Sequence, residues 1–160
     1  MIALTAVASQ VGHFTEFAEV IDDLIVSTVM VLITVGIHGS GIILLSKMLR
    51  LESQEEQAHH VPAFSARAFL FMQLLVLALF ALHGFEIWLY AVVYVLTGAV
   101  GDMASALYFS TISYAAIGYS DVHISPNWRL VGAIEGINGL LLLGWSTAFF
   151  VAVVTRLGRR

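Results

Sequence analysis

Three long apolar segments constrain the fold of this chain more than any other feature of its sequence. They cover about residues 24–46, 68–97 and 130–155. Each is long enough to cross the ~30 Å hydrocarbon core of a bilayer as a helix. Charged residues make up 11% of the chain, against about a quarter in soluble domains. The sequence therefore predicts an all-α membrane protein with three transmembrane helices.

Several classes of function find no support in the composition and motifs. The chain contains no cysteine, which excludes disulfides and cysteine-based metal sites. We find no nucleophile with a nearby base, no phosphate-binding loop and no basic patch for nucleic acid, so we expect neither an enzyme nor a nucleic-acid-binding protein. The first residues lack a basic region and a long apolar run, so we expect no cleaved leader.

The distribution of basic residues predicts the orientation of the helices. With the N-terminus external, Arg129 alone of the seven Lys and Arg residues lies outside. This asymmetry satisfies the positive-inside rule. We therefore expect a multi-pass protein of the cell (inner) membrane with a cytoplasmic C-terminus. The cytoplasmic basic residues would be Lys47, Arg50, Arg67, Arg156, Arg159 and Arg160.

A stretch between the second and third segments is too short to cross the bilayer. Residues 103–114 are compatible with a helix of roughly 18 Å at ~1.5 Å per residue. The residues after it form a run centred on Gly118 that is too irregular for a helix. Non-helical backbone at membrane depth is tolerated only where protein buries it or where it lines an aqueous path. The helix must therefore re-enter the membrane or lie on its surface, and we expect a helix and loop that re-enter from outside.

The loop carries a resemblance to a known family. Residues 116–121 read Ala-Ile-Gly-Tyr-Ser-Asp and resemble the potassium-channel filter Thr-Val-Gly-Tyr-Gly-Asp. The likeness to bacterial potassium-channel-like proteins with a single pore loop extends over residues 68–157. It includes Trp128-Arg129 and the run Glu-Gly-Ile-Asn-Gly-Leu-Leu-Leu-Leu-Gly-Trp-Ser-Thr at 135–147.

The resemblance implies a division of the chain into two parts. Residues 68–160 would form a pore domain, and residues 1–67 would add a further transmembrane helix and a cytoplasmic linker. Within the pore domain we expect an outer helix at 68–97, a pore helix at 103–114, a filter at 116–120 and an inner helix at 130–155. Near the end of the outer helix, Trp88, Tyr90 and Tyr94 fit an aromatic belt at the membrane interface.

The resemblance also implies how the loop would act. Backbone carbonyls would replace the hydration shell of a permeating monovalent cation, potassium or alternatively sodium, without any resident cofactor. One chain supplies one loop, so we expect a homotetramer. The contributing residues would be Ala116, Ile117, Gly118, Tyr119 and Ser120. Because Ala116 replaces the family's Thr and Ser120 its second Gly, potassium selectivity stays open; a positive φ at Ser120 would cost about 1–2 kcal/mol.

The last helix contains candidates for a hinge and a pore lining. Gly139 lies where the family bends its gate, although close helix packing explains such a residue equally well. At helical spacing, one stripe of side chains would line the cavity and gate: Leu140, Leu143, Thr147, Val151 and Val154. Above the filter, Asp121 would pair with Trp128 or with the pore helix.

Four ionisable side chains lie inside the apolar segments: His38, His83, Glu86 and Glu135. Such residues are functional candidates by default. His83 and Glu86, three residues apart, share a helix face. Three interpretations remain open. His83, Glu86 and Glu135 could form a hydrogen-bonded clamp behind the filter with pH-dependent gating. All four could instead form a metal site of a membrane enzyme or transporter, or they could make ordinary helix contacts. A non-conducting scaffold is the alternative to a channel.

Overall fold

The described residues fold into four α-helices and one short 3₁₀ turn. The computed structural model describes residues 2–59, 66–118 and 122–157. The helices are α1 (Ile2–His59), α2 (Ala66–Leu96), α3 (Met103–Tyr114) and α4 (Arg129–Leu157), with the turn η1 (Pro126–Trp128) before α4. The described part of the chain contains no strand. The all-α prediction is therefore confirmed.

Three of the helices are long and apolar enough to cross a membrane. The candidate spans are Phe17–Leu49, Phe69–Leu96 and Pro126–Arg156. The short helix α3 covers the residues 103–114 that the sequence indicates. α1 is longer than expected, because its 58 residues continue without a break on both sides of the predicted span at 24–46. At ~1.5 Å per residue it measures about 87 Å, so it must extend well beyond the bilayer.

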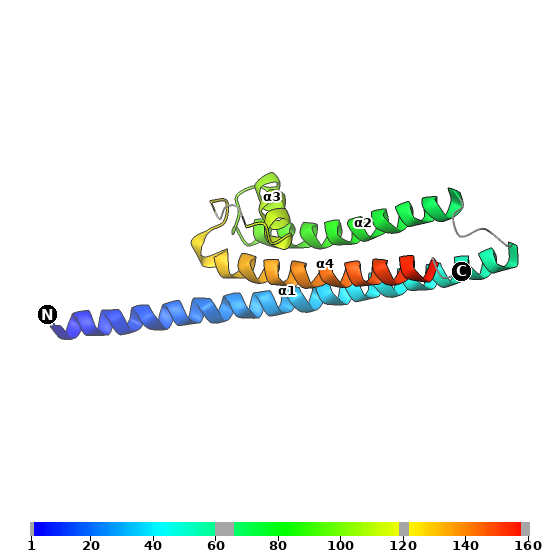
Figure 1. Cartoon of the computed structure of the whole chain (residues 1–160). Helices are drawn as coiled ribbons and strands as arrows, with labels where there is room; N and C mark the ends of the chain where they lie inside the picture. Colours follow the sequence, from blue (N-terminus) through cyan, green and yellow to red (C-terminus); the bar gives the residue numbers. More distant parts are fainter. Residues whose placement is uncertain (1, 60–65, 119–121, 158–160) are drawn as a thin grey trace.

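The long helices lie side by side, and α3 packs at one end of them. α1 contacts both α4 and α2, while α3 lies against the C-terminal part of α2 and the beginning of α4 (Figure 1). The N-terminal part of α1 extends past this end of the bundle, and α4 ends at the opposite end. α3 and the beginning of α1 therefore lie at the same end of the bundle.

The main apolar core surrounds α3 at this end of the bundle. Tyr94 lies at its centre and makes edge-on ring contacts with Phe109 and Trp128, with centroids 5.5 and 6.2 Å apart. Tyr90 and Tyr94 are 1% and 0% exposed, so the interpretation of both as members of an interfacial aromatic belt is wrong. Their hydroxyls find protein partners instead of the membrane interface. Trp88 is exposed, in keeping with that interpretation.

Two local features fix the position of α3. Its first turn is capped by Asp102, whose carboxylate accepts a hydrogen bond from the Ser105 N–H at 2.9 Å. Its other flank packs on glycines of α4. A β-carbon at Gly132 would lie 2.6 Å from the Phe109 ring, and one at Gly136 would lie 2.9 Å from the Ser113 carbonyl oxygen. Small residues thus let the two helices approach closely.

Candidate functional site

The loop after α3 begins as a tight cap on the helix. The N–H of Ala116 donates to the Ser113 carbonyl at 2.8 Å, and the N–H of Ile117 donates to the Ile112 carbonyl at 2.9 Å. This pair of bonds is the Schellman motif, whose first residue after the helix takes a left-handed conformation and is usually glycine. Here Ala116 occupies that position with φ 54°. Gly118 follows with φ 61° and donates to the same Ile112 carbonyl at 3.1 Å.

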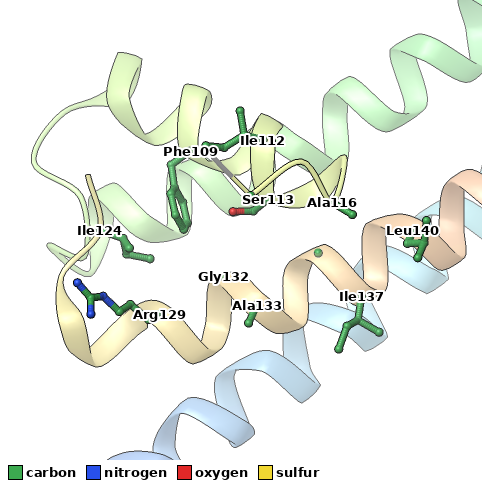
Figure 2. A pocket seen from close by; sticks show the side chains of 12 residues that line it. Phe109, Ile112, Ser113, Ala116, Ile124, Arg129, Gly132, Ala133, Ile137 and Leu140 are labelled. Atoms are coloured by element: carbon green, nitrogen blue, oxygen red, sulfur yellow. The ribbon is translucent and has the colours of Figure 1, made fainter. Parts of the chain in front are cut away.

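The capped loop opens onto a cavity beside α4. Figure 2 shows this cavity, with a volume of about 540 Å³, between the C-terminal part of α3 and the first half of α4. Ala116 and Gly118 line one side, and Ala133, Ile137 and Leu140 line the other. These three α4 residues are exposed in the single chain although they are apolar.

Behind the loop, five side chains from four helices form a closed ring of hydrogen-bond contacts. His38 Nδ1 lies 3.0 Å from Glu86 Oε1, and the Tyr114 hydroxyl donates to Glu86 Oε2. His83 Nδ1 lies 2.9 Å from the Tyr114 hydroxyl. Ser146 Oγ lies 3.0 Å from His83 Nε2 and 3.2 Å from His38 Nε2, which closes the ring. His38 and Glu86 are 0% exposed. We call these five residues the polar ring.

Glu135 belongs to a separate cluster. It accepts hydrogen bonds from Tyr94, at 2.7 Å to Oε2, and from Ser110. Ser110 also lies 3.0 Å from the Ile87 carbonyl oxygen. Among the described residues, the group spaced to bind one metal ion is His38, His83 and Glu86, without Glu135. The structure thus divides the four predicted ionisable residues between two sites. His38, His83 and Glu86 lie in one, and Glu135 lies in the other.

A third contact joins α1 to the middle of α4. The Asn138 amide donates to Thr34 Oγ1 at 2.8 Å and to the Tyr90 hydroxyl at 3.3 Å. Thr34 is 0% exposed and Asn138 is 2% exposed. Together with His38 in the polar ring, this contact gives α1 two polar anchors on the rest of the chain.

The remaining predicted residues fall into three groups. Tyr119, Ser120 and Asp121 lie outside the described residues, so the outer part of the predicted filter and the partner of Asp121 stay predictions. Trp128 is half-buried and packs on Tyr94. On α4, Leu140, Thr147 and Val151 are exposed, Leu143 and Val154 are partly buried, and Gly139 is buried against α3. The pore lining and the hinge also stay predictions.

Sequence reasoning missed the hydroxyl groups that contact the buried histidines and carboxylates. Tyr114 and Ser146 complete the polar ring, and Tyr94 and Ser110 hold Glu135. The sequence around a Ser or Tyr in an apolar helix does not indicate which residue its hydroxyl will contact. The useful signal is that a buried carboxylate must find donors, and hydroxyls on facing helices are the available ones.

Comparison with known protein families gives a match, which covers α3 and the loop after it. Residues 78–156 match a family described as ion channel. The match covers much of α2, all of α3, the loop and nearly all of α4, and it leaves α1 outside. No curated protein and no solved structure matched the chain. Through residues 78–156, this membrane protein is similar to a potassium-channel-like family of ion channels.

Proposed function

We propose that four copies of this chain surround a central pore that conducts monovalent cations, with potassium preferred over sodium. The observation that carries the proposal is the position of the loop after α3. It lies within the residues that match the ion channel family and opens onto the exposed face of α4. A helix too short to span, followed by a loop of this kind, is the part of such a protein that faces permeating ions.

The backbone of the loop supports a role in cation binding. The N–H groups of Ala116, Ile117 and Gly118 all donate to carbonyls of α3. The carbonyls of these residues are therefore the backbone groups through which this segment would bind a cation. The C-terminal end of a helix carries partial negative charge, so the end of α3 also favours a cation nearby.

The exposed face of α4 supports assembly around an axis. Leu140 is 61% exposed and Val151 is 53% exposed in the single chain. With Thr147 between them, these residues follow helical spacing along one side of α4. In the proposed tetramer this side would line the inner cavity, and the open cavity next to Ala116 would be covered by a neighbouring copy or face the axis.

Ion flux from purified protein in liposomes tests the proposal. We expect potassium flux above that of protein-free liposomes, together with a particle of four 17.4 kDa chains in native mass spectrometry. Absence of both potassium and sodium flux, at varied pH and membrane tension, would favour the non-conducting scaffold. Reversal potentials for wild-type and Ser120→Gly protein then measure selectivity. Because the variant restores the glycine of the family motif, we expect a stronger preference for potassium.

The orientation can be tested with single cysteines, because the chain has no native cysteine. We expect a cysteine near the N-terminus to react with an impermeant thiol reagent added outside intact cells. A cysteine at the C-terminus should react only after the cells are opened. The reverse pattern would overturn the proposed external N-terminus and place the loop after α3 on the cytoplasmic side.

A further inference from the structure

Four side chains of the polar ring present donor atoms toward one another from three helices. They are His38 on α1, His83 and Glu86 on α2, and Tyr114 at the end of α3. One ligand atom from each of His38, His83 and Glu86 lies within 4.8 Å of the others. His83 is the most exposed of these three, and only 11% of its side chain is exposed. Buried imidazole and carboxylate groups at such spacing form the donor set of a transition-metal site.

Three separations between donor atoms are close to those around a single metal ion. His38 Nδ1 lies 3.0 Å from Glu86 Oε1, and His83 Nδ1 lies 3.6 Å from Glu86 Oε2. The Tyr114 hydroxyl lies 2.9 Å from His83 Nδ1 and contacts Glu86 directly. Tetrahedral Zn²⁺ with ligands at ~2.0–2.1 Å places neighbouring ligand atoms about 3.3 Å apart. The donor atoms of these three pairs therefore need only small displacements to share one ion.

The outer contacts of the two histidines also suit a metal. Both Nδ1 atoms face Glu86, and both Nε2 atoms lie within hydrogen-bond distance of Ser146 Oγ. A metal-bound histidine donates its second ring N–H to an outer oxygen. A serine hydroxyl has two lone pairs and can accept both bonds. Ser146 is thus placed as the shared outer partner of two metal-bound histidines.

We propose that His38, His83, Glu86 and Tyr114 bind one transition-metal ion per chain, with Zn²⁺ the best-suited ion, and that Ser146 orients the two histidines. The site joins α1, which lies outside the family match, to α2 and to the last residue of α3. Metal binding would hold the end of α3, where the loop begins, against α1 and α2. The metal site does not depend on the proposed channel function.

Metal binding by the purified full-length protein tests this proposal. After removal of metal with a chelator, we expect one Zn²⁺ or Co²⁺ per chain in a titration, with the visible absorption of tetrahedral Co²⁺. Glu86→Gln and His38→Gln should abolish stoichiometric binding. Ser146→Ala should weaken it about 10–100-fold, as is typical for loss of an outer partner. Glu135→Gln, which alters the other buried carboxylate, is the matched control and should bind like wild type.

The wild-type measurement keeps the proposal falsifiable even if a variant fails to fold. Bound metal should raise the midpoint of thermal unfolding of wild-type protein, because an ion that binds only the folded state stabilises it. Absence of stoichiometric Co²⁺ binding to folded wild-type protein would overturn the proposal. The same follows if the Glu86→Gln variant, folded by gel filtration, binds metal as tightly as wild type. Either result would leave a polar ring held by hydrogen bonds alone.

Discussion

The backbone carbonyl of Tyr114 lies where a side chain at Gly139 would begin. A β-carbon at Gly139 would be 2.1 Å from the Tyr114 oxygen, a distance that real β-carbons essentially never show. Glycine at this point therefore sets how closely the end of α3 approaches the middle of α4. Since Tyr114 also belongs to the polar ring, the contact links the position of α4 to the base of the loop.

We expect Gly139→Ala to destabilise the protein, because the added methyl group forces α3 and α4 apart. Overpacking of this kind costs about 1–3 kcal/mol. The measurement is thermal unfolding in detergent, with ion flux as a second readout. Gly144→Ala is the matched control, since a β-carbon at Gly144 meets nothing within 4 Å. Equal melting temperatures for the two variants would contradict the close contact.

The conformation of Ala116 predicts an unusual response to restoring the family motif. Ala116→Thr recreates the Thr of the potassium-channel filter, but it places a β-branched residue at φ 54°, a conformation such residues strongly avoid. We expect the Thr variant to be less stable than an Ala116→Gly variant by at least about 1–2 kcal/mol. Ala116→Gly should be tolerated, because glycine adopts this conformation freely. A Thr variant as stable as the Gly variant would show that the loop does not form the observed cap in the assembled protein.

The cap of α3 predicts a pH dependence. The hydrogen bond from the Ser105 N–H is the largest cause that holds the pKa of Asp102 below its ordinary value. A lowered pKa in the folded state means that the carboxylate stabilises the fold above the unfolded value of about 3.9. This stabilisation is lost as the pH falls through the lowered pKa of Asp102 in the folded state. Melting temperatures of wild type and Asp102→Asn should therefore converge at acidic pH, and parallel curves would refute the effect.

The cluster around Glu135 predicts a difference between two substitutions. Glu135→Ala leaves the hydroxyls of Tyr94 and Ser110 without their acceptor in a buried place. Each unsatisfied group costs about 1–3 kcal/mol. Glu135→Gln keeps a polar side chain of the same shape and should cost less. Denaturant unfolding of both variants in detergent measures the difference, and an Ala variant as stable as the Gln variant would mean that water or other groups satisfy these hydroxyls.

Single cysteines can test the pore lining of α4. Thiol reagents should block ion flux through Leu140→Cys, Thr147→Cys and Val151→Cys channels, because these side chains lie on the exposed face that the proposal places along the pore. Trp145→Cys serves as the control. The Trp145 ring lies 5.5 Å from His38 on α1 and so points to another side of α4. Block at position 145 without block at the other three would reverse the assignment.

The sequence predicts the helices well, because each one follows from the residues within its own segment. Long apolar runs define α2 and α4, and the short helix at 103–114 is bounded by Gly101-Asp102 on one side and the Gly118 run on the other. The uninterrupted length of α1 was not predictable in the same way. Its ends are polar or mixed in character, so no apolar pattern marks them as part of one helix.

The contacts between helices were harder to predict, because they depend on which faces meet. His38 and Glu86 are recognisable as buried ionisable residues, but nothing near either one indicates that they touch. The position of Tyr94 in the chain suggested an interfacial aromatic residue, whereas packing of α3 buries it. Ala116 has no sequence signal for its positive φ, because the cap normally selects glycine.

The reach of α1 into the polar ring sets a limit on how far this protein can be shortened. A polypeptide that starts at residue 68 would lack both His38 and Thr34, and with them their contacts to Glu86 and Asn138. The Glu86 carboxylate and the Asn138 amide would then each face lipid on one flank with a partner missing. α1 is therefore an integral part of the fold. A chain that lacks it would need other side chains to replace His38 and Thr34 before it could fold.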